Sequence, residues 1–310
     1  MDKNPLLIIL GPTASGKTKL AVRIAAEMNG EVISADSRQV FKGMDIGTGK
    51  DLREYNFQGR SVPHHLINIR EAGEQYNVNA FKDDFYTVFS TLTAAGKLPV
   101  LCGGTGMYIH SILQNHQFTA VPVNEELRAA LPAHDLLALR ALLAVYPASL
   151  TAHADLSSAK RLVRAIEIAD YLQGNTLIEE ARPQVDALII GLDGAVDLRR
   201  ERILNRLTER FKEGLIEEVE GLLKSGITAE MLIFYGLEYK FVTEYLQNKL
   251  GLAELKEKLY IAIRQFAKRQ MTFFRKMEKD GVKINWLNSA LETDLLKEAV
   301  EKLYHESIEG

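Results

Sequence analysis

The chain has 310 residues, of which 46% are hydrophobic and 25% charged, an ordinary globular composition that suits one main domain with an appendage. Its formal net charge of −3 excludes a basic coat over the whole surface, so any nucleic-acid partner would need a local basic face. Cys102 is the only cysteine, which excludes an intramolecular disulfide and a cysteine-rich zinc site.

The first element expected along the chain is a buried strand that leads into a phosphate-binding loop. Apolar residues 6–10 precede the sequence Gly11-Pro-Thr-Ala-Ser-Gly-Lys-Thr18, and residues 19–27 favour a helix. In such a P-loop, backbone N–H groups and the positive end of the helix dipole face one anion. Lys17 adds a point charge, and the Thr18 hydroxyl suits Mg2+. The pattern predicts a phosphate site without identifying the molecule that carries the phosphate.

A second strand is expected over residues 31–35, which are short and rich in β-branched side chains. Residues 36–39 follow at its carboxyl end, where open parallel sheets bind ligands. Asp36 could accept a proton or hold a magnesium-bound water, or it could only cap the next turn. Residues 40–50 contain three glycines and are expected to form a loop near the site.

A third strand and a second glycine-rich loop are expected farther along. Residues 78–95 have helical spacing of apolar side chains, and residues 98–102 form another buried run. The sequence Gly103-Gly-Thr-Gly106 then precedes a helix. Thr105 is therefore a site candidate at the same edge as the P-loop, although the glycines could serve only close packing of the helix entry.

The α/β alternation stops near residue 120 and resumes with a buried strand over residues 182–192. The segment between is rich in alanine and leucine at helical spacing and has no run typical of a strand. We therefore expect an α/β fold of parallel strands flanked by helices, with a small all-helical insertion. The expected boundaries are residues 1–120 for the first part of the core, 121–176 for the insertion, and 177–310 for the rest of the core with basic C-terminal helices.

Basic side chains gather on three helical stretches. The strongest is residues 260–279, where residues 264–279 hold six Lys or Arg against one Glu, a local charge of +5. Arg264, Lys268, Arg275 and Lys279 share one face there, whereas Ile263, Phe266, Phe273, Phe274 and Met277 are expected to face the core. The other two stretches carry Lys160, Arg161 and Arg164, and Arg202, Arg206 and Arg210. Each could bind phosphates or simply form a solvated, ion-paired face.

Together these segments resemble the tRNA dimethylallyltransferase family, also called tRNA isopentenyltransferase. The resemblance is carried by residues 11–18 and by Asp36-Ser-Arg-Gln-Val-Phe-Lys-Gly-Met-Asp-Ile-Gly-Thr48. Residues 63–66, 103–106, 161–167 and 266–270 follow in the family's order. The chain departs from the family at Gly49-Lys50-Asp51, where Ala-Lys-Pro is usual, at Asn68, where aspartate is common, and at Glu238, where glycine is common. The resemblance implies a P-loop NTPase-like fold.

The resemblance also implies a reaction. A dimethylallyl group would pass from dimethylallyl diphosphate to N6 of the adenosine 3′-adjacent to the anticodon, in tRNAs that read codons beginning with U, with release of diphosphate and assistance from Mg2+. Asp36 would accept the N6 proton beside Thr105, and the adenine would leave the anticodon-loop stack. The implied partners are dimethylallyl diphosphate and the anticodon stem-loop of tRNA.

The residues implied for this reaction fall into four groups. The catalytic ones are Asp36, Thr105 and Lys17. Diphosphate would be bound by Gly11, Pro12, Thr13, Ala14, Ser15, Gly16, Lys17, Thr18 and Arg206. The tRNA would be bound by Asp36, Ser37, Arg38, Gln39, Thr105, Arg128, Lys160, Arg161, Arg164, Arg264, Lys268, Arg269 and Arg275. Thr18 would bind Mg2+.

Three other functions remain open at this point. A P-loop kinase of a small metabolite would explain residues 11–18 but not the basic helix. An adenylate isopentenyltransferase would prenylate free AMP instead of tRNA. A non-catalytic, nucleotide-switched RNA-binding module would give Asp36 and Thr105 no function. The sequence shows no leader pattern and no apolar run of membrane-spanning length, so we expect a cytoplasmic protein without membrane association, acting as a monomer.

Overall fold

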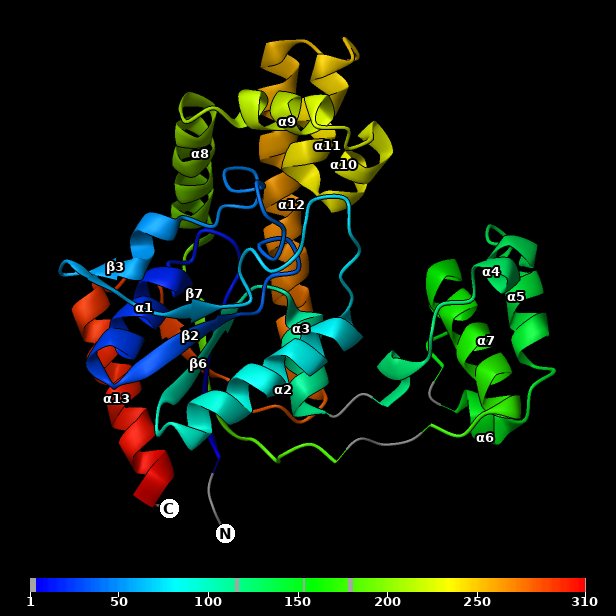
Figure 1. Ribbon diagram of the computed structural model, residues 1–310, viewed down its shortest axis with the longest axis horizontal. Helices are drawn as coiled ribbons and strands as arrows, with labels where there is room; N and C mark the ends of the chain where they lie inside the picture. The colour runs from blue at the N-terminus through cyan, green and yellow to red at the C-terminus, as the bar shows by residue number, and fades with distance from the viewer. Residues whose placement is uncertain (1–3, 115–116, 153, 178–180, 310) are drawn as a thin grey trace. The chain divides into compact units, whose positions relative to one another are not determined.

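A computed structural model describes residues 4–114, 117–152, 154–177 and 181–309 of the chain. The chain divides into two compact units. Met1–Gln114 and Pro183–Gly310 form the first, called here the α/β unit, and Asn115–Arg182 form the second, called the helical unit. In the sequence, the helical unit therefore lies between the two segments of the α/β unit, as the order of the colours in Figure 1 shows.

The α/β unit is built on a six-stranded sheet in the order β5-β2-β6-β1-β7-β8, and its pairings among the described residues are parallel. The strands are β1 (Pro5–Leu10), β2 (Gly30–Ser34), β5 (His64–His65), β6 (Leu98–Gly103), β7 (Asp186–Asp193) and β8 (Asn285–Asn288). Central strands of such a sheet are covered on both faces, which explains their continuous apolar runs. The prediction of a parallel α/β sheet flanked by helices is confirmed.

Helices cover the two faces of this sheet (Figure 1). On one face, α1 (Lys17–Glu27) and α13 (Thr293–Glu309) pack with Leu7 and Ile9 of β1. On the other, α2 (Val78–Ala94), α3 (Gly106–Leu113) and α12 (Leu252–Lys279) pack with Leu6, Ile8 and Leu10. Successive side chains of a strand point to opposite faces, so one apolar run supplies two cores.

A second group of helices follows β7 and ends in α12. It contains α8 (Val196–Lys212), α9 (Leu215–Lys224), α10 (Ala229–Tyr235) and α11 (Leu237–Leu246). These helices bury a shared core with Val40, Phe41 and Met44 of the loop after β2. The group therefore packs onto a segment at the carboxyl end of the sheet. A turn of 3-10 helix, η1 (Leu52–Tyr55), and a hairpin of β3 (Asn56–Phe57) and β4 (Arg60–Ser61) follow that loop.

The helical unit contains η2 (Gln117–Ala120), α4 (Glu125–Ala130), α5 (Leu136–Leu143), α6 (Ala148–Thr151) and α7 (Ala159–Gly174). Leu139, Leu143, Leu162 and Ile166 form its core. No strand interrupts the described part of this segment. Nowhere in the described chain is a helix both long and apolar enough to cross a bilayer.

Candidate active site

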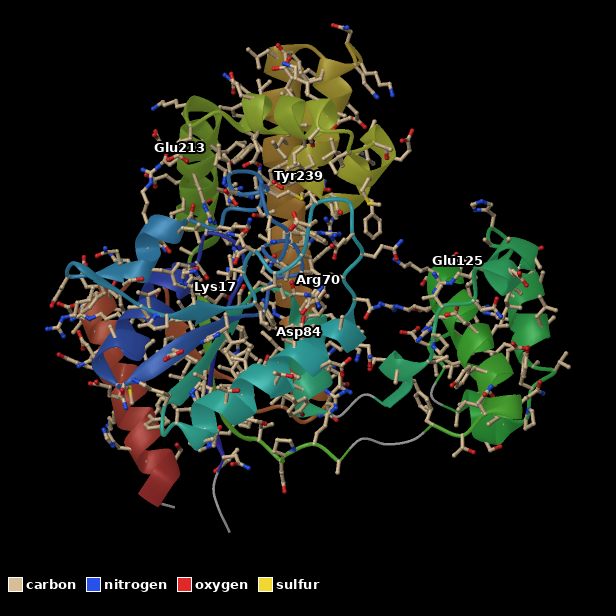
Figure 2. All side chains as sticks on the ribbon, viewed as in Figure 1. Lys17, Arg70, Asp84, Glu125, Glu213 and Tyr239 are labelled. Carbon is tan, nitrogen blue, oxygen red and sulfur yellow. The ribbon has the colours of Figure 1, made fainter. Side chains whose placement is uncertain are left out.

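A cavity of about 380 Å³ lies within the α/β unit, at the carboxyl ends of β1, β2 and β6. Its walls come from the P-loop, the segments after β2 and β6, and helices α8, α11 and α12. Figure 2 labels Lys17 at the start of α1 and Tyr239 on α11, and both side chains line the cavity. A cavity of this size suits a small organic ligand. Predicted site residues that line it are Thr13, Lys17, Thr18, Asp36, Ser37, Arg38, Gln39, Thr105, Arg206 and Arg269.

The P-loop is tied to the second glycine-rich loop by Gln270 of α12. The Thr13 N–H donates to Gln270 Oε1 at 2.9 Å, and Gln270 Nε2 donates to the Gly104 carbonyl at 3.0 Å. Gln270 is buried, so these hydrogen bonds satisfy one backbone group of each loop in place of water. Sequence reasoning gave Gln270 no role, although it ends the segment 266–270 that supports the resemblance.

A second cavity of about 350 Å³ shares Lys17, Thr18 and Arg206 with the first. Other P-loop residues predicted to bind diphosphate line this one, namely Ala14, Ser15 and Gly16. Gly11 and Pro12 occupy the start of the loop, where the Pro12 carbonyl accepts from the Ser15 N–H at 3.3 Å. Lys17, the cationic side chain of the P-loop, thus lines both cavities.

Positive charge is concentrated between these cavities. Loss of surrounding water lowers the pKa of the Lys17 ammonium, and nearby Arg206 lowers it further. Arg206 donates to the Gly49 carbonyl at 3.0 Å and pairs with Asp51. Burial raises the pKa of the Cys102 thiol to about 12, so this cysteine stays neutral. A bound anion would relieve the repulsion between Lys17 and Arg206.

Asp36 and Thr105 follow the neighbouring strands β2 and β6 and line the same cavity. The Ser37 N–H donates to Thr105 Oγ1 at 3.2 Å, and the Thr105 N–H donates to the Ala35 carbonyl at 3.2 Å. Asp36 Oδ1 accepts the Arg38 N–H at 2.9 Å, so its carboxylate does stabilise the turn. Asp36 also lines the cavity. One side chain thus fits both roles considered from the sequence.

Arginine and aromatic side chains form the cavity rim. Arg38 donates to the Phe234 carbonyl at 3.0 Å, and its guanidinium lies 5.2 Å from the Phe234 ring centre. Arg269 lies 5.9 Å from the centre of the Phe266 ring. The prediction that Phe266 faces the core is wrong, since its side chain lines the cavity and the residue is 41% exposed. It sits between the buried and solvent faces of α12.

The remaining predicted basic residues of α12 lie along the helix outside the cavity wall. Lys268, Arg275 and Lys279 are exposed, and Arg264 is half-buried with its guanidinium 5.2 Å from the Tyr260 ring centre. The predicted basic face of this helix is therefore open to solvent for most of its length. Contact between that face and tRNA stays a prediction.

In the helical unit, two predicted tRNA-binding arginines hold a buried carboxylate. Arg128 binds Glu167 through two hydrogen bonds of 3.0 and 3.1 Å, and Arg164 pairs with the same side chain. Burial opposes ionisation of Glu167, but hydrogen bonds from Asn124, Arg164 and Arg128 outweigh it and hold the pKa of the carboxyl below its usual range. These arginines therefore stabilise the unit whether or not they also contact RNA.

The other two predicted residues of this unit are exposed. Lys160 and Arg161 begin α7, and Arg161 pairs with Asp155 at 2.8 Å. An exposed pair of this kind contributes little to stability and exchanges readily for a phosphate. Their tRNA contacts likewise stay predictions.

Comparison with known proteins shows which families and relatives this chain resembles. Residues 39–277 match the family model described as IPP transferase, and residues 4–61 match one described as Isopentenyl transferase. The chain is 51% identical over 299 residues to "tRNA dimethylallyltransferase 2" of Porphyromonas gingivalis, covering 96% of this chain and 99% of the relative. It is 49% identical over 291 residues to a protein of the same name from Bacteroides fragilis, with 94% and 95% covered.

Solved structures agree with the fold. The tRNA isopentenylpyrophosphate transferase of Bacillus halodurans matches with a TM-score of 0.73 and 32% identity, covering 99% of this chain and 97% of that one. A eukaryotic dimethylallyltransferase acting on tRNA matches with a TM-score of 0.74 over 92% of this chain and 74% of its own. Its identity of 21% supports similarity of fold alone.

Proposed function

This chain belongs to the IPP transferase family, and from that premise we propose that it transfers a dimethylallyl group from dimethylallyl diphosphate to tRNA. The acceptor is N6 of the adenosine 3′-adjacent to the anticodon in tRNAs that read codons beginning with U. The observation that carries the proposal is one cavity lined both by the P-loop and by Asp36 and Thr105. A phosphate site and a candidate base thus face the same space.

The donor end of the cavity supports cleavage of the allylic C1–O bond. Breaking this bond sends its electron pair to the diphosphate, so negative charge grows on the leaving group. Lys17 and Arg206 line this cavity, and together with the N–H groups at the start of α1 they would stabilise that charge. The hydrogen bond from Arg206 to Gly49 fixes its guanidinium before the substrate arrives.

The acceptor end supports attack by the exocyclic amine. The N6 lone pair forms a bond to C1 of the dimethylallyl group, and the N6 proton passes to the Asp36 carboxylate. The turn bond from Arg38 to Asp36 Oδ1 orients this carboxylate. The Thr105 hydroxyl accepts the Ser37 N–H, and Thr105 lines the same cavity as Asp36, so it could position the adenine.

The site also fits Mg2+. No cluster of three or more His, Cys, Asp or Glu residues capable of holding a metal occurs in the described chain, but Mg2+ on a diphosphate is usually held by one or two carboxylates together with phosphate oxygens and waters. The Thr18 hydroxyl and the Asp51 and Glu54 carboxylates line one cavity and match that donor set. When bound there, Mg2+ would supply positive charge to the diphosphate oxygens.

The tRNA is proposed to contact basic residues on each unit. Arg38 and Arg269 line the cavity beside exposed aromatic rings, which suits the unstacked bases of an RNA loop. Lys268 and Arg275 extend the basic face along α12, and Lys160 and Arg161 add one on α7. We further propose that residues 121–176 act as a tRNA-contacting insertion between core segments 1–120 and 177–310, and that the protein works as a monomer in the cytoplasm.

The test is a transfer assay with ATP omitted. Purified protein and Mg2+ are incubated with labelled dimethylallyl diphosphate and either unmodified anticodon stem-loop RNA or AMP. The proposal predicts label in the RNA. Label only in AMP would make the protein an adenylate isopentenyltransferase. Absence of transfer, together with ATP-dependent phosphorylation of a small molecule, would make it a kinase.

A further inference from the structure

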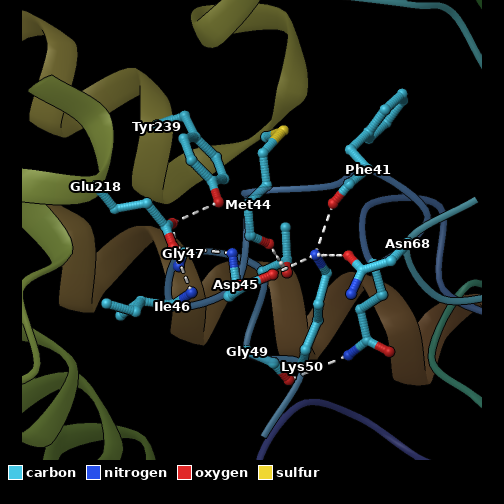
Figure 3. Close-up of polar contacts among 12 residues, drawn as sticks. Phe41, Met44, Asp45, Ile46, Gly47, Gly49, Lys50, Asn68, Glu218 and Tyr239 are labelled. Atoms are coloured by element: carbon cyan, nitrogen blue, oxygen red, sulfur yellow. Dashed lines mark hydrogen bonds and ion pairs between the residues drawn. The ribbon is translucent and has the colours of Figure 1, made fainter. Parts of the chain in front are cut away.

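The loop of residues 45–50, called here the cavity loop, forms one wall of the cavity without regular secondary structure. Gly47, Thr48 and Gly49 line the cavity. Backbone groups of such a loop need partners outside a helix or sheet ladder, or they cost free energy when water is excluded. Glu218 accepts three of the loop's backbone N–H groups, and the Lys50 side chain joins the last residue of the loop to Asp45, its first (Figure 3).

The first anchor is Glu218 of α9, which does not line the cavity. Its Oε2 accepts the N–H groups of Asp45 and Ile46 at 2.8 and 2.7 Å, and its Oε1 accepts the Gly47 N–H at 2.9 Å. The Tyr239 hydroxyl donates to Oε1 at 2.8 Å. Four donors thus converge on one carboxylate, and hydrogen bonds to an ionised acceptor are about twice as strong as neutral ones.

Tyr239 also limits the loop sterically. A Cβ atom on Gly47 would lie 2.6 Å from the Tyr239 ring, so only glycine allows this approach. Since Tyr239 lines the cavity, the Glu218 carboxylate connects a cavity side chain to the backbone of the cavity loop. Figure 3 shows both on the same side of the loop.

The second anchor is Lys50, whose side chain is completely buried. Its Nζ donates to the Phe41 carbonyl at 2.6 Å and to Asp45 Oδ1 and Asn68 Oδ1, both at 2.5 Å. Burial lowers the pKa of the Lys50 ammonium, while Asp45 opposes that shift. All three protons of the ammonium therefore have acceptors, and the bond to Asp45 joins the last residue of the loop to the first.

One carbonyl of the cavity loop, that of Gly49, accepts hydrogen bonds from two residues that line the cavity. Gly49 O accepts from Gln39 Nε2 at 3.1 Å and from Arg206 Nη2 at 3.0 Å. Gly49 has φ +61°, and a Cβ there would lie 1.7 Å from Arg210 Nη2 and 2.6 Å from Arg206 Nη2. The position of this residue therefore sets where both guanidinium groups can lie.

We infer that Glu218 is a positioning residue for diphosphate binding, which it serves by fixing the cavity loop so that Gly49 holds Arg206 against the diphosphate. The inference rests on the proposed function, because it takes Arg206 as a diphosphate ligand. It adds a residue on α9, outside the cavity, to the residues on which the donor site depends.

The variant Glu218→Gln tests this role because it keeps the size of the side chain and removes its charge. One amide oxygen cannot accept all four donors, so the loop and Arg206 lose their fixed position. We expect the KM for dimethylallyl diphosphate and the Kd for inorganic diphosphate each to rise about tenfold. The Kd for stem-loop RNA should stay within about twofold of wild type. Glu217→Gln, an exposed neighbour on the same helix, is the matched control.

A second variant covers the case in which Glu218→Gln does not fold. Tyr239→Phe removes one of the four hydrogen bonds and should raise the diphosphate Kd by about threefold. A lower melting temperature with an unchanged diphosphate Kd and KM in the variants that fold would overturn the inference, because Glu218 would then be merely structural. Calorimetry with inorganic diphosphate needs no turnover, so failure of wild type to transfer label would contradict the proposed function separately.

Discussion

The proton-accepting role proposed for Asp36 predicts a specific defect in Asp36→Asn. The amide has nearly the same shape as the carboxylate, and its oxygen can still accept the Arg38 N–H that lies 2.9 Å away. The turn after β2 should therefore survive. An amide cannot take the N6 proton, so the loss falls on the chemical step, which we expect to slow by about 10²- to 10⁴-fold.

The variant distinguishes a chemical role of Asp36 from a structural one, because it retains the hydrogen bond from the Arg38 N–H. That bond contributes about 0.5–1.5 kcal/mol to the stability of the fold. Asp36→Asn should keep that stability, whereas Asp36→Ala should lose it in addition to the rate. The rate is measured in single turnover, with protein in excess over stem-loop RNA and saturating labelled dimethylallyl diphosphate. Diphosphate affinity, measured by calorimetry, should change by less than about twofold.

A matched control is Asp197→Asn, whose side chain is 90% exposed on α8. It should leave both the rate and the diphosphate affinity unchanged. If Asp36→Asn retained the wild-type single-turnover rate, Asp36 would not be the proton acceptor. If it lost diphosphate affinity as strongly as rate, Asp36 would be a structural or metal-holding residue instead.

Three further predictions concern charge. Lys17→Met should lower kcat/KM for the donor by about 10²- to 10³-fold, because it removes a charge proposed to face the leaving group. Lys302→Met, on α13 with its side chain 78% exposed, should change kcat/KM by less than about twofold, and equal effects of the two variants would remove Lys17 from the site. Lys268→Ala and Arg275→Ala should each weaken tRNA binding and reduce its dependence on salt, and an unchanged salt slope in both would exclude α12 from the interface. Glu167→Gln should destabilise the helical unit by about 3 kcal/mol in denaturant unfolding. Because the pKa of Glu167 is depressed when folded, its contribution is present above its ordinary pKa of 4.5 and lost as the pH falls below it; a Gln variant with the same acid transition as wild type would contradict this.

Local sequence patterns were sufficient to predict the P-loop and the strands that surround the proposed donor site. The P-loop and the buried strands are continuous segments whose spacing or apolar character is visible in a few residues. The positions of Asp36 and Thr105 followed because parallel strands share one carboxyl edge. The structure confirms the parallel sheet and places both residues at that edge.

Contacts between distant segments could not be predicted in this way. Gln270 meets Thr13 across 257 positions of sequence, and Glu218 meets Gly47 across 171. Each is a side chain bonded to backbone, which leaves no periodic signal in the sequence. Phe266 was misplaced for a related reason, because helical periodicity distinguishes buried from exposed faces but not the wall of a cavity.

The basic residues of the helical unit show a limit of charge patterns. Arg164 lies three positions before Glu167 on α7, and both were visible in the segment that supports the resemblance. Spacing alone could not show that Glu167 is buried or that Arg128 joins it from another helix. Burial decides whether such charges are a structural pair or a surface for RNA.

We propose that one cavity holds both a P-loop-bound diphosphate and an adenine of the anticodon loop. Nucleoside analysis tests this on unmodified full-length tRNA after incubation with the protein, Mg2+ and dimethylallyl diphosphate without ATP. The product should be digested to nucleosides and, in parallel, to mapped fragments. We expect N6-dimethylallyladenosine at the position 3′-adjacent to the anticodon and at no other position. Modification of a different nucleoside or position, or of none, would contradict it.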